Sequence, residues 1–163
     1  MKVRTVYLAK RIETEVTLQM AKALSPYELT PMQFAVLSFV EADRINFSSA
    51  QLSRRFAMTP QSMNEIVRIL LDKAFIFKTI DPAHKRILRL SLTELGKEIL
   101  IHCNAEINAV ERNLFGDLTE EEYTTYRFLM GKILEKARTD APTTETSLRG
   151  TKPPNATSNT PSV

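Results

Sequence analysis

The chain has 163 residues, of which 43% are hydrophobic and 25% are charged, and this is enough apolar material for one domain with a real core. No apolar run is long enough to span a bilayer, and the single cysteine, Cys103, excludes an internal disulfide and a cysteine-based metal cage. Because the N-terminus is too charged for a secretory signal, we expect a cytoplasmic protein without a membrane partner.

The net charge of +3 is distributed unevenly along the chain. Residues 44–92 hold nine Lys or Arg against three acids, a net of +6, whereas residues 93–137 hold five against nine, a net of −4. A basic middle of this kind indicates a surface for a polyanion on a scaffold that avoids the same polyanion. On charge alone, an unevenly charged solvated surface is an equally good interpretation.

Helix-start signals mark the first half of the chain. Residues 4–24 place apolar side chains on one side of a helix and predict the first helix. Thr30 and Pro31 then supply an N-cap and a first-turn proline for a second helix, with apolar positions following at helical spacing. Ser48 with Gln51 forms a capping-box pattern at the start of a third helix.

The third helix and the next one are joined within three or four residues, which predicts a helix-turn-helix. Thr59 and Pro60 start this fourth helix, and we expect it to run to about Lys73. In such a unit, the N-terminal part of the second helix enters the DNA major groove. Its apolar stripe faces the core, which leaves outside the polar side chains of Gln61, Ser62, Asn64, Glu65 and Arg68.

These polar side chains suit DNA. Gln and Asn can form paired hydrogen bonds with adenine, Arg with guanine, and a carboxylate accepts from cytosine. Ser62 and the helix N-terminus suit phosphate oxygens, and basic neighbours stand just before the turn. A plain polar helix face is the alternative interpretation. The predicted DNA contacts of this unit are Arg54, Thr59, Gln61, Ser62, Asn64 and Arg68.

Residues 76–93, IFKTIDPAHKRILRLSLT, predict a β-hairpin. The alternating face formed by Leu88, Leu90 and Leu92 is expected to anchor it to the core, and Asp81 begins the turn. Its tip presents Lys85 and Arg86, which phosphates or a narrow minor groove would attract. A basic hairpin directly after the second helix makes the unit a winged helix-turn-helix. The alternative is a solvated tip that only discourages edge pairing.

The rest of the chain predicts two more helices and a tail. A helix beginning near Thr93 carries an apolar seam that includes Cys103, and residues 115–117 end it. Thr119 with Glu122 starts a last helix. Residues 138–163 are rich in Thr, Pro and Ser and predict a disordered tail, so the folded part is residues 1–137.

Four segments together resemble the multiple-antibiotic-resistance regulator (MarR) family. They are LTPMQFAVL (29–37), SSAQLSRRFAMTPQSMNEIVRILLDKAFI (48–76), IDPAHKRILRLSLTELGKEI (80–99) and FGDLTEEE (115–122). The resemblance covers about residues 1–137 as a single domain. It implies a mainly α fold, with a winged helix-turn-helix at about 30–92 and a helical dimerisation region at 1–24 and 93–137.

The same resemblance implies function. It implies a cytoplasmic, nucleoid-associated homodimer that regulates transcription, as a repressor, by binding double-stranded DNA at a pseudo-palindromic operator. It places Arg86 in the minor groove and base-reading side chains within 60–68, and it implies a small aromatic or lipophilic effector that releases the DNA. Two positions depart from the family pattern: His84 replaces an acid at the wing tip, and Ala74 replaces the glycine after the recognition helix.

The remaining residues offer no other chemistry. Cys103 lies on an apolar seam and is expected to be a buried structural residue rather than a redox sensor. We find no phosphate-cradling glycine motif, no metal-ligand spacing and no nucleophile elbow, so we expect no cofactor, no metal and no enzyme activity. The alternative from another class is a winged-helix protein-interaction module, similar to an anti-repressor, that binds an acidic protein partner instead of an operator.

Overall fold

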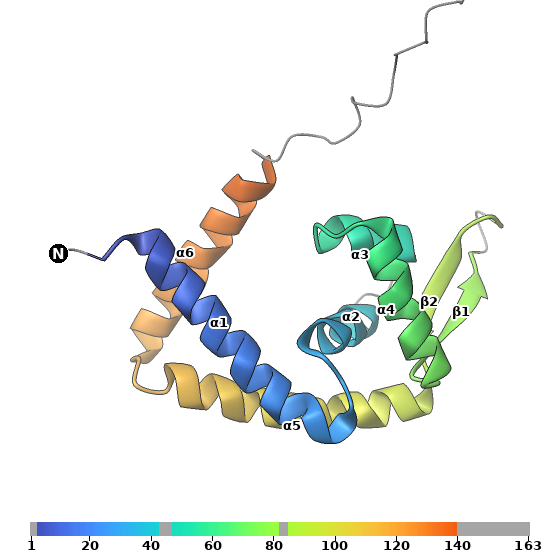
Figure 1. The fold of residues 1–163 in the computed structure, drawn as a ribbon, viewed down its shortest axis with the longest axis horizontal. Helices are drawn as coiled ribbons and strands as arrows, with labels where there is room; N and C mark the ends of the chain where they lie inside the picture. The colour runs from blue at the N-terminus through green and yellow to red at the C-terminus, as the bar shows by residue number, and fades with distance from the viewer. Residues whose placement is uncertain (1–2, 43–46, 82–84, 140–163) are drawn as a thin grey trace, which may run out of the picture. The chain divides into compact units, whose positions relative to one another are not determined.

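The mainly α fold with a small two-stranded sheet is confirmed (Figure 1). The computed structural model describes residues 3–42, 47–81 and 85–139, and the side chains as far as residue 137. The chain forms two compact units, Met1–Asp117 and Leu118–Val163. In chain order, the elements of the first unit are α1 (Thr5–Leu24), the short 3-10 helix η1 (Ser25–Tyr27), α2 (Pro31–Ala42), α3 (Ser49–Arg55), α4 (Pro60–Asp72), β1 (Ile76–Ile80), β2 (Leu88–Leu92) and α5 (Glu94–Phe115).

The helices begin where the capping signals predicted. At the start of α2, the Gln33 amide donates to Thr30 Oγ1 at 3.2 Å and the Thr30 amide donates to Gln33 Oε1 at 3.0 Å. Ser48 and Gln51 form the same reciprocal pair at the start of α3, with distances of 3.4 and 2.8 Å. Each pair satisfies two backbone donors that a helix start would otherwise leave without a partner.

The core of the first unit is built around α2, which contacts α1, α4, α5 and β2. Val36 and Leu37 of this helix have no exposed surface. The surrounding elements contribute further side chains with at most 2% exposure, namely Leu24, Leu52, Met63, Val67, Leu70, Ile76, Leu90, Leu100 and Cys103. The predicted apolar stripe of α4 therefore faces the core, and its polar face is left outside.

Helices α3 and α4 both end in a left-handed alanine. The φ angle is 50° at Ala57 and 56° at Ala74. After α4, the Ala74 amide donates to the Leu71 carbonyl at 2.9 Å and the Phe75 amide donates to the Leu70 carbonyl at 3.0 Å, which is the Schellman pattern. The turn therefore keeps the backbone conformation of a glycine although alanine stands there, at a cost of roughly 1–2 kcal/mol.

The start of α5 holds the base of the hairpin through backbone contacts. The Thr93 amide donates to the Phe75 carbonyl at 3.0 Å, and Thr93 Oγ1 donates to the Ala74 carbonyl at 2.7 Å. A Cβ atom at Gly96 would lie 2.0 Å from the Phe75 carbonyl oxygen. Only glycine allows this approach, so the LTELG segment fixes the turn after α4 against α5.

The hairpin has the predicted strands, with Ile76 opposite Leu92 and Ile80 opposite Leu88. Leu90 and Leu92 are buried, whereas Leu88 is 46% exposed. The expectation that Leu88, Leu90 and Leu92 all anchor the hairpin is therefore correct only for the two leucines nearer its base. Leu88 lies next to the tip, beyond the reach of the core.

The described part of the second unit is α6 (Glu120–Thr139). As predicted, Thr119 and Glu122 cap its start, because the Thr119 amide donates to Glu122 Oε2 at 2.8 Å and the Glu122 amide donates to Thr119 Oγ1 at 3.3 Å. The helix continues two residues beyond the predicted boundary at 137, and the rest of the predicted tail, 140–163, lies outside the described residues. No helix in the described ranges is long and apolar enough to cross a membrane.

The left-handed alanine gives a prediction about stability. Replacing Ala74 by glycine should raise the free energy of unfolding by about 1 kcal/mol, because glycine adopts this φ angle without a Cβ penalty. As a control, the same change at Ala109, which is exposed on α5, should lower it by about 1 kcal/mol. Urea denaturation of both variants measures the two values, and a destabilised Ala74→Gly protein would contradict the account.

Candidate nucleic-acid interface

Helix α3, the turn at 56–59 and helix α4 form the predicted helix-turn-helix (Figure 1). The two helices pack against each other, and Leu52 of α3 and Met63 of α4 are both fully buried. In the turn, the Met58 amide donates to the Ser53 carbonyl at 2.9 Å, which closes α3 and lets α4 begin at Pro60. The angle between the helices is thus set by buried contacts and by the backbone of the turn.

The outer face of α4 carries the predicted side chains. Gln61, Ser62, Asn64 and Arg68 are all exposed, as is Glu65 between them. None of them packs into the core, so the face is available to a ligand. Being exposed does not assign any of them to DNA, and their role as contacts stays a prediction.

Thr59 and Ser62 shape the N-terminus of α4. Thr59 Oγ1 accepts from the Ser62 amide at 3.1 Å, and the two hydroxyl oxygens lie 2.8 Å apart. Both hydroxyls are exposed and lie at the positive end of the helix dipole. A phosphate oxygen would meet the hydroxyls of Thr59 and Ser62 there, because the Ser62 amide already donates to Thr59 and Pro60 has no N–H.

Asn64 is already engaged with the first helix of the motif. Its Oδ1 accepts from Ser49 Oγ at 2.5 Å. A paired contact with adenine needs both the oxygen and the nitrogen of the amide, so Ser49 would have to release the oxygen first. The sequence suggested that Asn64 contacts a DNA base, but it gave no sign of the hydrogen bond to Ser49, which lies 15 residues away in the chain.

Arg68 is held by two carboxylates of its own helix. Its Nε donates to Glu65 Oε2 at 3.1 Å, another guanidinium nitrogen lies 2.5 Å from Glu65 Oε1, and the third lies 3.0 Å from Asp72 Oδ2. The hydrogen bond from Arg68 lowers the pKa of Glu65 below its usual range. Sequence reasoning missed this group, although spacings of three and four residues could have indicated it.

The end of α3 contributes two arginines. Arg54 and Arg55 are exposed in its last turn, where positive side chains oppose the negative end of the helix dipole. The guanidinium carbon of Arg55 lies 5.2 Å from the centroid of the Phe39 ring, a cation–π geometry. Arg54 shows the exposure that a phosphate contact requires.

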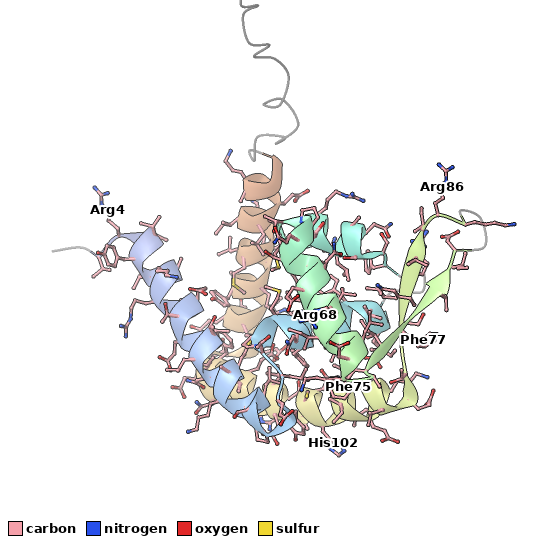
Figure 2. All side chains as sticks on the ribbon, turned by 45° about the vertical axis from the view of Figure 1, so that its right-hand side comes forward. Arg4, Arg68, Phe75, Phe77, Arg86 and His102 are labelled. Atoms are coloured by element: carbon pink, nitrogen blue, oxygen red, sulfur yellow. The ribbon has the colours of Figure 1, made fainter. Side chains whose placement is uncertain are left out.

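Lys85 and Arg86 are exposed at the tip of the hairpin, and Figure 2 shows Arg86 pointing away from the strands. They lie on the same unit as α4, which is next to the hairpin in the chain and contacts β1. Pro82 and His84 of the same tip lie outside the described residues.

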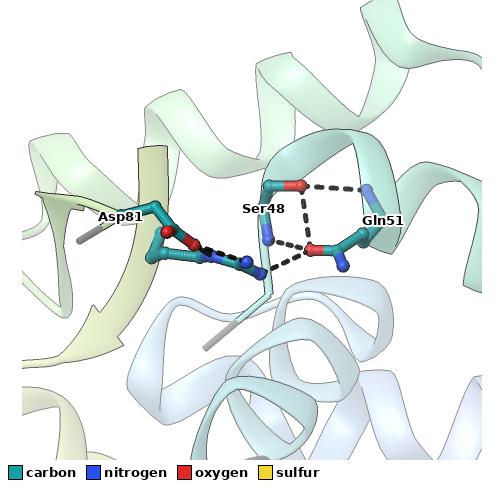
Figure 3. Close-up of polar contacts among 4 residues, drawn as sticks. Ser48, Gln51 and Asp81 are labelled. Atoms are coloured by element: carbon teal, nitrogen blue, oxygen red, sulfur yellow. Dashed lines mark hydrogen bonds and ion pairs between the residues drawn. The ribbon is translucent and has the colours of Figure 1, made fainter. Parts of the chain in front are cut away.

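Arg89 does not belong to this exposed basic surface. Its guanidinium lies between Asp81 and Gln51 (Figure 3), with one nitrogen 2.5 Å from Asp81 Oδ2 and another donating to Gln51 Oε1 at 3.1 Å. The side chains of Arg89 and Asp81 are only 15% and 8% exposed. The same Gln51 oxygen accepts from the Ser48 amide, so the contact joins the wing to the capping box of α3. Asp81 thus positions Arg89, which makes the contact with α3, in addition to the turn role that the sequence suggested.

Cys103 and His102 form no second site with the other residues that the structure describes. Cys103 is fully buried, and burial raises the pKa of its thiol to about 11, which fits the expected structural role. His102 is exposed and stacks on Tyr27, with ring centroids 6.4 Å apart. Within the described ranges, no group of His, Cys, Asp and Glu side chains could hold a metal ion.

Comparisons of the sequence and of the fold with known proteins point to the same family. A sequence model of the MarR family matches residues 27–87, from η1 to the wing. The HTH-type transcriptional repressor Rv2887 of Mycobacterium tuberculosis is 27% identical over 127 residues, which are 78% of this chain and 91% of the relative. Two solved structures of Rv2887 are similar in fold. Its complex with DNA has a TM-score of 0.66, 25% identity, and coverage of 81% of this chain and 98% of that one. Its complex with salicylic acid has a TM-score of 0.64, 26% identity, and coverage of 81% and 97%.

The buried Asp81–Arg89 pair should contribute more to stability than an exposed pair. Asp81→Asn should lower the free energy of unfolding by about 1–3 kcal/mol, because it leaves a mostly buried guanidinium without its charged partner. A double-mutant cycle with Arg89→Gln should show a coupling energy above that of Glu94 and Lys97, which are at least half exposed and should couple by under about 1 kcal/mol. Equal coupling energies would contradict the role assigned to this pair.

The raised pKa of Cys103 predicts a loss of stability in alkali. The pKa of the thiol is 9.0 without burial and about 11 in the folded chain. The stabilisation that comes from burying the neutral thiol is therefore complete below pH 9 and is lost as the pH rises through 11. Denaturant titrations across this range should show the loss, and Cys103→Ala should reduce it. At pH 8, a thiol reagent should react only as fast as the protein opens. Rapid labelling of the native protein would contradict the buried position.

Proposed function

This chain belongs to the MarR family, and from that premise we propose that it is a DNA-binding transcription regulator that acts as a homodimer. The observation that carries the proposal is the pairing, on one unit, of an exposed polar face of α4 with an exposed basic hairpin tip. In this proposal, α4 enters the major groove and the tip reaches the adjacent minor groove.

The residues divide into three kinds of contact. Arg54, Thr59, Ser62 and Lys85 are proposed to hold phosphates, because charge and hydroxyl donors fix position without reading sequence. Gln61, Asn64 and Arg68 are proposed to reach base edges from the outer face of α4. Arg86 is proposed to enter the minor groove. The exposure of each side chain supports these roles.

A second copy of the chain is proposed to cover apolar surface that the described residues leave open. On α1, Val6, Tyr7, Leu8 and Ile12 are each more than 40% exposed. On α6, five large apolar side chains are exposed to similar degrees, namely Phe128, Leu129, Met130, Ile133 and Leu134. Contiguous apolar faces of this kind usually mark protein interfaces. Two copies would place two α4 helices on a pseudo-palindromic operator, roughly 34 Å apart.

The relatives support repression and an effector. Rv2887 is named a transcriptional repressor, and its structures contain DNA in one case and salicylic acid in the other. By analogy, we propose repression relieved by a small aromatic or lipophilic compound, without assigning its binding residues. The family is one of transcription regulators, so we propose a cytoplasmic, nucleoid-associated protein without catalytic activity.

The wing role is tested by salt dependence. Arg86→Ala should weaken binding to promoter DNA for most sequences, and the slope of log K against log salt should fall by about one, because one phosphate-region contact is lost. Lys10→Ala removes an exposed charge from α1 and serves as the control with an unchanged slope. An Arg86→Ala slope equal to that of the wild type would remove the wing assignment.

The same titration tests the function as a whole. Binding that does not depend on salt, or no binding to any promoter fragment, would favour the alternative of a protein-interaction module. Light scattering of the free protein tests the dimer, for which a mass matching one 18.5 kDa chain would be the contradicting result.

A further inference from the structure

The outermost stripe of α4 is acidic, although the surface around it is basic. Gln61, Glu65, Arg68 and Asp72 follow one another at spacings of four, three and four residues, so they lie on one side of the helix. Their formal charges give a net of −1, whereas Arg54, Lys85 and Arg86 at the flanks are all positive. In the proposed binding mode this stripe brings no excess positive charge to the phosphates, so we expect it to contribute to selection rather than to affinity.

Within this stripe, Glu65 and Arg68 form a bidentate ion pair. Two guanidinium nitrogens of Arg68 contact the two carboxylate oxygens of Glu65, at 3.1 and 2.5 Å. Both side chains are more than half exposed, so the pair contributes little to the stability of the fold. The pair holds a carboxylate and a guanidinium side by side on the exposed face of the helix.

The carboxylate remains a pure acceptor. The hydrogen bond from Arg68 lowers the pKa of Glu65, so the group stays ionised at neutral pH and presents no proton. In the major groove, guanine and thymine offer only acceptors and a methyl group at this edge, and adenine places an acceptor beside its donor. Cytosine N4 offers a donor without a neighbouring acceptor of its own, and it is the base edge that suits a carboxylate.

The guanidinium completes the match. Arginine donors suit the O6 and N7 acceptors of guanine, the partner of cytosine. Arg68 has five N–H donors, so it can keep a bond to Glu65 while it donates to a base. The Glu65 carboxylate and the Arg68 guanidinium, held next to each other, are thus complementary to the cytosine donor and the guanine acceptors of one C·G pair.

We propose that Glu65 and Arg68 act together as a specificity pair that reads one C·G base pair in each half of the operator. Glu65 accepts from cytosine N4, and Arg68 donates to guanine O6 and N7. The proposal rests on the DNA-binding function proposed above and deepens it. It also explains why an acidic residue can stand on a surface that faces DNA. A carboxylate is repelled by phosphates and by base acceptors, so binding is favourable only where a base offers it a hydrogen-bond donor.

Selection from a random DNA pool with the full chain tests this pair. The wild type should select a two-fold-symmetric motif with one fixed C·G pair in each half. Glu65→Gln should change that position towards A·T or relax it, since an amide can pair with adenine, and should leave the other positions unchanged. On matched probes, the preference of the wild type for C·G over A·T at that position should fall by roughly tenfold or more in the variant. Asp72→Asn removes the same charge from the same stripe but leaves the Glu65–Arg68 pair intact, so it should select the wild-type motif.

Each outcome bears on the proposal. A Glu65→Gln protein that selects the wild-type motif would overturn it, and so would an Asp72→Asn protein with the same change at the same position. If the wild type selects no motif at all, the proposed DNA-binding function itself fails. If the wild type selects a motif that Glu65→Gln does not alter, only the specificity pair fails.

Discussion

The wing is joined to the start of α3 by a largely buried contact, the Arg89 guanidinium between Asp81 and Gln51 (Figure 3), and beside it the Leu90 amide donates to the Phe47 carbonyl at 2.9 Å. Arg89 and Asp81 lie on the hairpin and Gln51 lies on α3, so the contact fixes the basic tip relative to the helix-turn-helix. Because Gln51 also caps α3 through Ser48, the start of the helix and the wing share one oxygen atom. The Leu90–Phe47 bond and the buried Leu90 and Leu92 hold the base of the hairpin, and the Arg89 contact adds a restraint nearer the tip. Such a restraint keeps the tip at a defined distance from α4, as a contact with an adjacent minor groove would require.

The sequence predicted most of the fold because its signals are local. Thr30, Ser48, Thr59 and Thr119 each accept a hydrogen bond from a backbone amide three residues later, so the helix starts could be read from short patterns. The contacts that position the site are of another kind. Arg89 meets Gln51 across 38 residues, and Asn64 meets Ser49 across 15. No local pattern specifies such pairs, so the sequence alone does not distinguish the largely buried Arg89 from the exposed Lys85 and Arg86.

The proposed DNA contacts separate affinity from selection. The exposed positive side chains lie at the end of α3 and at the wing tip, where they would follow the phosphates of two strands. The outer stripe of α4 is instead held in an internal network of Glu65, Arg68 and Asp72. A regulator that must leave non-specific DNA gains from this division, because a groove-facing surface with no excess positive charge binds firmly only where its donors and acceptors are matched.

The claim that one rigid unit presents α4 and the wing together, in two copies, is tested most directly by hydroxyl-radical footprinting of the protein on a promoter fragment that it binds. We expect two equivalent protected regions related by two-fold symmetry, with centres about one helical turn apart, each flanked by protection of the adjacent minor groove. A single unsymmetrical footprint, or symmetric protection without the minor-groove flanks, would contradict it.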